Sequence, residues 1–586
     1  MAERRAAIQS TDEDRFSVAA VANRTDAHIG LPESSADPAD DYTFLRRVYL
    51  DVVGRPATPA EITAFGFDPD PDKRDRLVER LLKSDEYSAN WTRYWRDTIF
   101  SRATNVRAGL VRPAFAQWMN DQLSDGAGWD QIVTELLTAT GPVNDNGASA
   151  LIFAHEGVPE EIAAEASRLF TGIQIQCANC HDHPWDQWKR EQFHELVAFF
   201  PRISVRRERG SDNMFDYEIA SVNNNTRTNP ALSRFFLTRL DRNRDGAISE
   251  SEAKETPIAR IFAQPQAREN IDKNGDGRIT IDEIANARPP ENRPGQGKTE
   301  HFMPDLSDPA SEGTRIDPRF FVTGQRVRTD MTDEERRTAV ARLITSKSNP
   351  WFAKAIVNRM WYELTGTAFY TPVDDIGPGR EVRHEAALES LCEGFIHNNY
   401  DLKWLIRAIT RTAVYQRSPN SDGEGFQHCE PTRLRADQLY SALCQTLNVS
   451  SLPIRSADVR PGMMYRNGQA DPGRESFSRV FGFDPSVSRS ELTGSIPEAL
   501  FMMNSPEVQR IIAANRDQDT VSQLLTRFTD NDSLISEMYL RCLGREPRNS
   551  EVSIAMDYLK TSGNRREGTE DLLWALINSA EFMSKP

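Results

Sequence analysis

Two twelve-residue stretches, DRNRDGAISESE at 241–252 and DKNGDGRITIDE at 272–283, restrict the fold of this chain more than any other feature. Oxygen donors stand at positions 1, 3, 5, 9 and 12 of each stretch, and glycine stands at position 6. A hard cation such as calcium needs six to eight oxygens at about 2.4 Å, so the loop must turn alternate side chains inward around a glycine bend. Counting the backbone carbonyl at position 7, the candidate ligands are Asp241, Asn243, Asp245, Ala247, Ser249 and Glu252 in the first loop and Asp272, Asn274, Asp276, Arg278, Thr280 and Glu283 in the second.

This spacing is that of the EF-hand loop. One such loop could be a solvated acidic turn, but two complete matches in one short segment are hard to explain in that way. Ile248 and Ile279 occupy position 8 of the two loops, where we expect them to pair the loops back to back. The pattern therefore predicts calcium ions as ligands and favours a structural calcium clip, with a docking module as the alternative.

The segments on both sides of the loops are predicted to be helical. Apolar residues recur every three or four positions in DKRDRLVERLLKSDEY, PEEIAAEASRLFTG and YDLKWLIRAITRTAVYQ, which is the period of one helix face. We therefore predict a mainly α fold in which two helical domains flank the EF-hand pair. The expected parts are an N-terminal segment 1–40, a helical domain 41–205, an insert 206–290, a Pro-rich linker 291–317 and a C-terminal helical domain 318–586.

An internal echo links the two ends of the chain. YLDVVGRPATPAEI at 49–62 resembles YLRCLGREPRNSEV at 539–552, and each copy is followed by a leucine-rich segment that ends in a similar signature, KSDEY or NSAEF. We predict a small duplicated helical unit in which Gly54 and Gly544 end the first helix of each copy. The alternative is that helical hairpins simply look alike.

The net charge of −16 argues against a general nucleic-acid binder, because phosphate binding needs clustered Lys and Arg. No apolar run reaches the roughly 18 residues that a membrane span requires. We therefore expect no nucleic-acid partner and no membrane span.

Four of the six cysteines stand alone in the sequence and are expected to be small buried side chains. Cys177 and Cys180 form the remaining pair, and His181 follows directly. This C-x-x-C-H order is the attachment pattern for c-type haem, in which two thiols form thioethers to the porphyrin and the adjacent imidazole binds the iron. Candidates for the sixth iron ligand are His155, His194 and the Met502–Met503 pair.

Other readings of the cluster remain open. Zinc could use Cys177, Cys180 and His183, with His194 or His155 as a fourth ligand. A redox disulfide is disfavoured by the helical surroundings, because such motifs usually open a βαβ unit. A structural disulfide or an inert pair of thiols is the simplest alternative.

Several blocks of the sequence resemble a known domain pair. FLRRVYLDVVGRPATPAEI, LLKSDEYSANWTRYWRD and GIQIQCANCHDHPWDQW together resemble the planctomycete cytochrome-type domain, a family of unknown function. NPWFAKAIVNRMWYELTGTAFYTPVDDI, YDLKWLIRAITRTAVYQRS, RLRADQLYSALC and IPEALFMMNSPEV resemble its usual C-terminal partner domain. The resemblance implies an exported protein, so we expect a periplasmic or extracellular location, although MAERRAAIQSTDEDRF lacks the apolar core of a signal peptide.

The best candidate for a polar cluster in the second domain comprises Asp374 and Asp375 together with Asn358 and Trp361. Paired carboxylates can act as acid and base or bind a cation, and the alternative is a helix-capping loop. The family usually continues into an Asn-Pro-Pro-Ser-His-like stretch, whereas this chain reads GPGREVRHEAAL and keeps only His384.

From the sequence we expect an exported calcium-binding protein with a covalent haem, which acts with a redox partner in electron transfer or an oxidoreductase reaction. The alternative is a non-enzymatic, calcium-stabilised surface or scaffold protein whose Cys/His cluster binds zinc or forms a disulfide. No catalytic residue is assigned.

Overall fold

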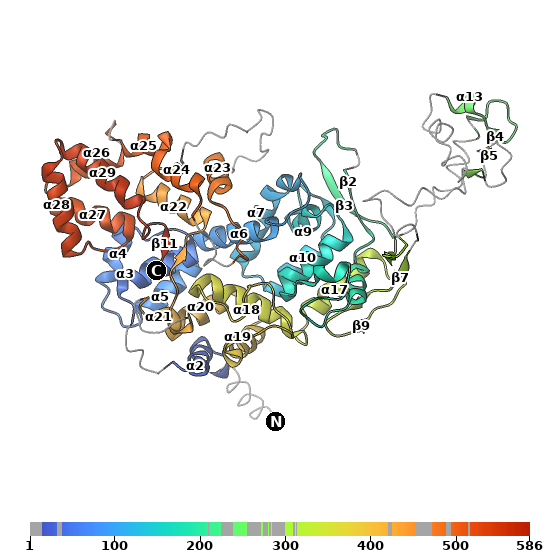
Figure 1. The fold of residues 1–586 in the computed structure, drawn as a ribbon, viewed down its shortest axis with the longest axis horizontal. Helices are drawn as coiled ribbons and strands as arrows, with labels where there is room; N and C mark the ends of the chain where they lie inside the picture. The colour runs from blue at the N-terminus through green and yellow to red at the C-terminus, as the bar shows by residue number, and fades with distance from the viewer. Residues whose placement is uncertain are drawn as a thin grey trace.

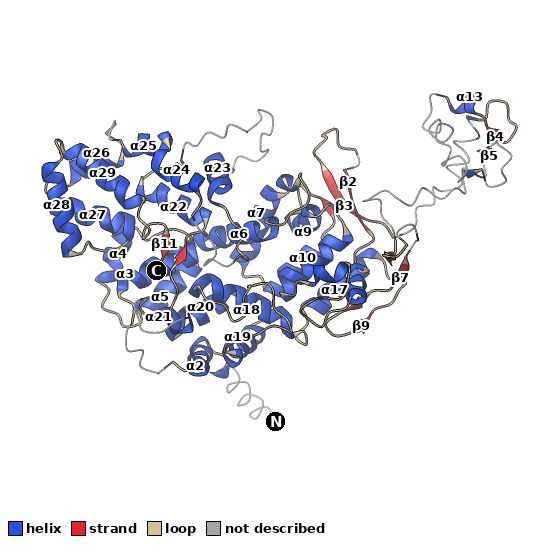
Figure 2. Ribbon diagram, viewed as in Figure 1, coloured by secondary structure: helices blue, strands red, loops and turns tan. Residues whose placement is uncertain are grey.

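The structure is a computed structural model, and most of its described residues are helical, as predicted (Figure 2). The described residues are 14–31, 38–208, 210–223, 238, 240–254, 271–272, 279–280, 283, 299–308, 311, 313–419, 425–452, 471–487, 494–513, 516–517 and 519–586.

The part that precedes the insert contains helices and one small sheet. The helices are α2 (Val18–Ile29), α3 (Asp41–Val53), α4 (Pro59–Gly66), α5 (Lys73–Leu82), α6 (Asp85–Phe100), η1 (Ala108–Leu110), α7 (Arg112–Asp125), α8 (Trp129–Thr138), η2 (Gly147–Ser149), α9 (Ala150–Ala154), α10 (Pro159–Thr171), η3 (Ile175–Asn179) and α11 (Arg190–Val197). The strands β1 (Gly141–Pro142), β2 (Ile203–Arg207) and β3 (Tyr217–Ser221) form an antiparallel sheet in the order β1-β3-β2, with Val205 opposite Ile219.

The insert and the C-terminal part follow. Their strands are β4 (Ala247–Ile248), β5 (Ile279–Thr280), β6 (His301–Met303), β7 (Thr314–Ile316), β8 (Arg319–Phe320), β9 (Gln325–Arg326), β10 (Thr432–Arg433) and β11 (Ser584–Lys585). Their helices are α13 (Glu250–Ala253), α17 (Asp333–Ile344), α18 (Pro350–Thr365), α19 (Glu385–His397), α20 (Leu402–Arg411), α21 (Ala413–Gln416), η4 (Gly425–Gln427), α22 (Ala436–Thr446), α23 (Pro472–Phe481), α24 (Ile496–Asn504), α25 (Pro506–Ile512), α26 (Thr520–Arg527), α27 (Asn531–Leu543), α28 (Asn549–Thr561) and α29 (Arg565–Ile577).

Helices α5 and α10 show why the amphipathic pattern predicts the fold well. The four apolar residues of the predicted stripe on α5 are all buried: Leu77, Val78, Leu81 and Leu82. Helix α10 begins with Pro159 in its first turn and ends at Gly172, which adopts a left-handed conformation with φ of 67°. Glycine carries no Cβ penalty in that conformation, so it ends the helix directly before the cysteine cluster.

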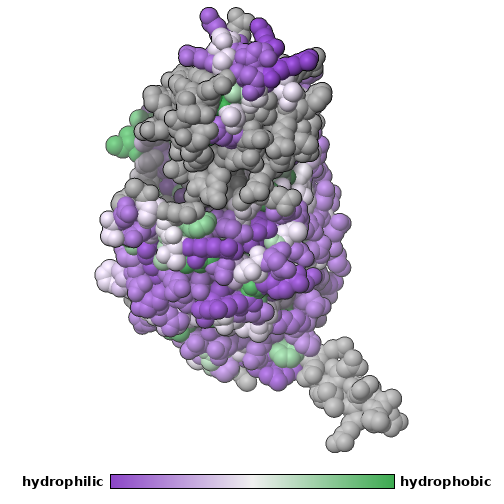
Figure 3. Space-filling view, turned by 90° about the vertical axis from the view of Figure 1, so that its right-hand side faces the viewer, coloured by the Kyte–Doolittle hydropathy of each residue, from purple (hydrophilic) through white to green (hydrophobic). Residues whose placement is uncertain are grey.

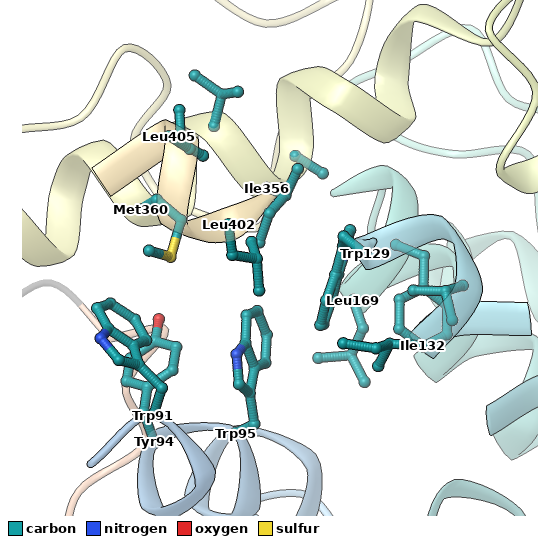
Figure 4. Packing of buried hydrophobic residues seen from close by; sticks show 14 of the residues in the cluster. Trp91, Tyr94, Trp95, Trp129, Ile132, Leu169, Ile356, Met360, Leu402 and Leu405 are labelled. Carbon is teal, nitrogen blue, oxygen red and sulfur yellow. The ribbon is translucent and has the colours of Figure 1, made fainter. Parts of the chain in front are cut away.

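One hydrophobic core joins both sides of the insert. Figure 4 shows Trp95 from α6 and Trp129 from α8 beside Ile356 and Met360 from α18. The two indole rings stack with centroids 4.2 Å apart, and both are almost fully buried. Burying about 200 Å² of aromatic surface stabilises a fold by roughly 5 kcal/mol per ring before entropy costs. The core is therefore continuous between the segments 41–205 and 318–429.

A second core gathers the apolar residues of α22 to α29 together with Leu50 of α3. Figure 1 shows α27, α28 and α29 at one end of the molecule, next to α3 and α4, with the chain end at β11 beside α3. The two segments that carry the internal echo therefore lie side by side in space.

The first copy of the echoed unit is a helical hairpin closed by an arginine. Gly54 ends α3 with φ of 73°, and Arg55 then donates hydrogen bonds to Glu61 and Glu86, at 2.9 Å and 2.6 Å. The Arg55 guanidinium also lies over the ring of Tyr49, 5.2 Å from its centroid.

The second copy repeats this arrangement. Gly544 ends α27 with φ of 73°, and Arg545 donates to Glu551 and Glu581, at 2.8 Å and 2.6 Å. Its guanidinium lies 5.6 Å from the ring centroid of Tyr539. Since helix end, arginine, both carboxylates and tyrosine correspond one to one, the structure confirms a duplicated helical unit.

Figure 3 shows a mostly hydrophilic surface on the side of the molecule that carries the insert, with only isolated hydrophobic residues among the described ones. In the part of the chain that the structure describes, no helix has both the length and the apolar character of a membrane span.

Candidate functional site

The cysteine cluster lies on the connection between α10 and α11. Ile175–Asn179, within the stretch GIQIQCAN, forms the 3₁₀-helix η3. Ile175 and Ala178 are buried, so their side chains fasten η3 to the core. Cys177 and Cys180 are consequently left exposed.

Neither thiol of the pair is in a disulfide, and His181 beside them is also exposed. The Nδ1 atom of His181 lies 2.7 Å from the backbone carbonyl oxygen of Asp182. A carbonyl can only accept, so Nδ1 carries the proton, and in the neutral ring the lone pair is on Nε2. A ligating histidine typically has its other nitrogen fixed in this way.

Asp182 ties the loop to the start of α11. Its carboxylate accepts hydrogen bonds from the backbone N–H of Arg190 and from Lys189 Nζ, both at 3.0 Å. The pKa of Asp182 is lowered below its ordinary value, mainly by the hydrogen bond from the Arg190 amide and next by the one from the Lys189 ammonium. The carboxylate is therefore ionised at neutral pH.

His183, a predicted metal ligand, stabilises the loop itself. It is buried, its backbone N–H donates to the carbonyl of Trp188 at 2.8 Å, and its Nδ1 accepts from the backbone N–H of Trp185 at 3.3 Å. Within the described residues, no three His, Cys, Asp or Glu side chains are close enough to hold a metal ion together. A zinc site that includes His183 thus stays a prediction without a converged ligand set.

His194 forms a buried pair that the sequence did not predict. Its Nδ1 lies 2.8 Å from His301 Nε2, its Nε2 donates to the carbonyl of Asn179 at 3.1 Å, and the two rings stack. Burial is the main reason that the pKa of His194 lies below its ordinary value, so the ring stays neutral. Because both ring nitrogens have partners, His194 is not available as a ligand in this arrangement. His301 comes from the polar segment before α17, where no periodic pattern marks it.

The remaining candidates for a sixth iron ligand are His155, Met502 and Met503, and their environments differ. His155 is buried with Nδ1 3.4 Å from Thr104 Oγ1, and burial lowers its pKa. Met502 packs into the second core, whereas Met503 is half exposed. The sixth position therefore remains unassigned.

Asp374 belongs to an internal ion-pair cluster. Its carboxylate accepts from Arg168 Nη1 and lies 3.4 Å from Arg359 Nη2, and Arg168 also binds Glu165 at 2.6 Å. Burial alone would raise the pKa of Asp374, but the two guanidinium groups outweigh it and the net pKa is lowered. An ionised carboxylate clamped between two arginines is not free to act as an acid or base, which favours a structural role.

Asn358 and Asp375 fit the same structural role. The Asn358 amide donates to the carbonyls of Tyr370 and Val373, and its oxygen accepts from the backbone N–H of Tyr370. Asp375 is partly exposed and pairs with Arg380 at 2.8 Å.

The first predicted calcium loop has the shape that its sequence requires. Gly246 adopts φ of 83°, and its N–H donates to Asp241 Oδ2 at 2.9 Å. Glu252 accepts from the Ser249 N–H at 3.0 Å, and hydrogen bonds from Ser249 are the main reason that the pKa of Glu252 falls to about 2. Asp241 and Glu252 thus supply carboxylate oxygens, hard donors of the kind that calcium prefers, at positions 1 and 12 of the loop.

The second loop is described at Asp272, Ile279, Thr280 and Glu283, whereas Asn274, Asp276 and Arg278 lie outside the described residues. Glu283 accepts from Thr280 N–H and Oγ1 at 2.9 Å and 2.8 Å, as Glu252 does from Ser249. Ile248 faces Ile279 in the antiparallel pair of β4 and β5, which confirms the predicted back-to-back arrangement.

Comparison with known families gives three matches. Residues 30–205 match PSCyt2, a protein of unknown function (DUF1549), residues 336–446 match PSD1, a protein of unknown function (DUF1553), and residues 269–286 match the EF hand. No curated protein and no solved structure gives a match. The chain therefore contains the two domains that the resemblance predicted, with an EF hand between them, and this EF hand supports calcium as a ligand.

Proposed function

We propose that this protein is a calcium-binding electron-transfer protein with a c-type haem attached through Cys177 and Cys180 and bound by His181. One observation carries the proposal: two exposed, unpaired thiols stand next to an imidazole whose Nδ1–H is already bonded to a carbonyl. This is the donor set that covalent haem requires, so the residues present fit the group.

A haem bound there would supply one-electron chemistry. The residues of the chain would hold it through a short, well-anchored segment. Ala178 and Ile175 fix η3 in the core, and Asp182 fixes the next residues to α11 through Lys189 and the Arg190 amide. The Asp182 carbonyl orients the His181 ring, which would keep Nε2 directed at the iron.

The proposal has consequences for location and partners. Thioether attachment takes place outside the cytoplasm, so we propose a periplasmic or extracellular protein that exchanges electrons with a redox partner. The exposure of Cys177, Cys180 and His181 would place the haem edge near the surface, where electron transfer between proteins is direct.

We also propose that both EF-hand loops bind calcium and that the ions clip the insert into one unit. The β4–β5 pairing joins the loops, so occupancy of one loop would stabilise the other.

The test of the haem proposal is an absorption spectrum of the protein made together with a haem-maturation system. We expect a Soret band that survives denaturation in the natural sequence and disappears in the Cys177→Ala, Cys180→Ala double variant. A matched control, Cys392→Ala, removes a buried thiol far along the chain and should leave the band unchanged. Protein without a Soret band but with one zinc per chain by elemental analysis would refute the proposal and support the zinc-bound scaffold.

A further inference from the structure

A loop of the second domain lies directly against the segment that follows the cysteine pair. A Cβ atom added at Gly377 would overlap Asp186 Oδ2. A Cβ atom added at Gly379 would lie 3.1 Å from both Asp186 Oδ1 and the carbonyl oxygen of Trp185. Side chains do not fit at these two positions without a shift of Asp186 or of its backbone.

The need for glycine here is steric. The positions where the backbone of this chain turns left-handed do not include Gly377 or Gly379. Alanine would therefore adopt the same backbone conformation without left-handed strain, and the penalty comes from the close contacts with Asp186 and, at Gly379, also with the Trp185 carbonyl.

The same loop is fastened to the helix that precedes η3. The backbone N–H of Ile376 donates to the carbonyl of Gly172 at 2.7 Å. Gly172 in turn has no space for a Cβ, which would lie 2.6 Å from Ile376 Cγ1. The buried pair of Arg168 and Asp374 adds a third attachment, so the loop bridges both ends of the cysteine segment.

Where the loop 374–379 meets residues 184–187, the contact is open to solvent at one edge. A shallow surface depression there is lined from both domains by Pro184, Trp185, Asp186, Gln187, Pro378 and Gly379. Trp185 is 74 % exposed at its rim. The approach to this side of the cysteine segment is thus shaped by both domains.

We propose that residues 374–379 of the second domain support residues 172–188, the segment that carries the cysteine pair. Gly377 and Gly379 are positioning residues: because they have no side chain, the loop packs directly against Asp186 and holds residues 182–188 in place. The cysteine site is then assembled from both domains. This inference concerns the loop itself, so it stands or falls independently of whether Cys177 and Cys180 carry a haem.

The test is hydrogen exchange in the full-length chain, with the backbone amide of His183 as the probe, since this amide donates to Trp188 and closes the segment. We expect Gly377→Ala to speed its exchange about tenfold relative to the natural sequence, because overpacking weakens the closed form. The matched control is Gly109→Ala, where an added Cβ meets no heavy atom within 4 Å, and it should have no effect.

A double-variant cycle separates the proposed contact from general damage. In an Asp186→Ala background the carboxylate is gone, so Gly377→Ala should then cause no further increase in exchange. Gly379→Ala, with its longer contact, should act in the same direction but more weakly, and it serves if Gly377→Ala does not fold. Unchanged exchange in both glycine variants, or an equal effect of Gly377→Ala with and without Asp186, would overturn the inference.

Discussion

The buried ion pair between Arg168 and Asp374 gives the sharpest prediction about how the two domains hold together. Both side chains are only 2 % exposed, and they come from α10 and from the loop that follows α18. Asp374→Asn removes one negative charge, so Arg168 keeps Glu165 as an ion-pair partner while Arg359 loses its carboxylate. Removing one partner of a buried pair costs about 3–5 kcal/mol, and the remaining Glu165 places this case near 3 kcal/mol.

The expected loss can be followed by thermal unfolding. For a cooperative unit of about 300 residues, 3 kcal/mol corresponds to a decrease in the midpoint of about 5 °C. The matched control is the neighbouring Asp375→Asn, which breaks a partly exposed pair with Arg380 and should cost less than about 1 kcal/mol. Equal midpoints for the two variants would refute the role of Asp374 as a domain clamp.

The pH dependence follows from the lowered pKa of Asp374. A carboxyl with a depressed folded-state pKa contributes stability above its unfolded pKa, and this contribution is lost as the pH falls through the folded value. The difference between the natural sequence and Asp374→Asn should therefore be constant from about pH 8 to pH 5 and shrink below about pH 4. A difference that disappears near neutral pH would contradict the assignment.

Two further predictions concern the duplicated unit and the calcium loops. Gly54 and Gly544 share the same left-handed φ, but a Cβ at Gly54 would also lie 2.8 Å from Asn90 Cγ, whereas at Gly544 it would meet nothing closer than 3.8 Å. Gly544→Ala should thus lower the free energy of unfolding, measured with denaturant, by about 1 kcal/mol. Gly54→Ala should lower it by about 1–3 kcal/mol more, because of the overlap with Asn90. Equal losses in the two variants would contradict the role of this overlap. Calcium at one hundred times its Kd should stabilise the insert by about 2.7 kcal/mol and slow exchange of its loop amides about a hundredfold. The Glu252→Ala, Glu283→Ala double variant should lose this protection, and loops whose exchange ignores EDTA would rule out the calcium clip.

Local patterns predicted much of the fold. The stripe on α5, the glycine end of α10 and the pairing of Ile248 with Ile279 follow from spacing within a few residues. Such features depend on helix period and loop geometry, which the sequence carries directly. The same holds for the family blocks and the EF-hand spacing.

Other features could not be predicted because they join distant parts of the chain. Arg168 and Asp374 are more than two hundred positions apart, and neither has a neighbour in sequence that marks it as half of a buried pair. His301 lies in a polar segment with no period, yet it is the partner of His194 beneath the cysteine loop. The alternation of apolar and polar residues before Cys177 does not reveal the 3₁₀-helix η3, because a short turn can bury Ile175 and Ala178 without a helical period.

The central claim, covalent haem at the cysteine pair, is tested most directly by mass spectrometry of the peptide that contains Cys177 and Cys180, taken from protein produced with haem maturation. The account predicts that this peptide carries the mass of one haem and that neither thiol can be alkylated. An unmodified peptide with two alkylated thiols, from cells that mature other c-type cytochromes, would contradict it.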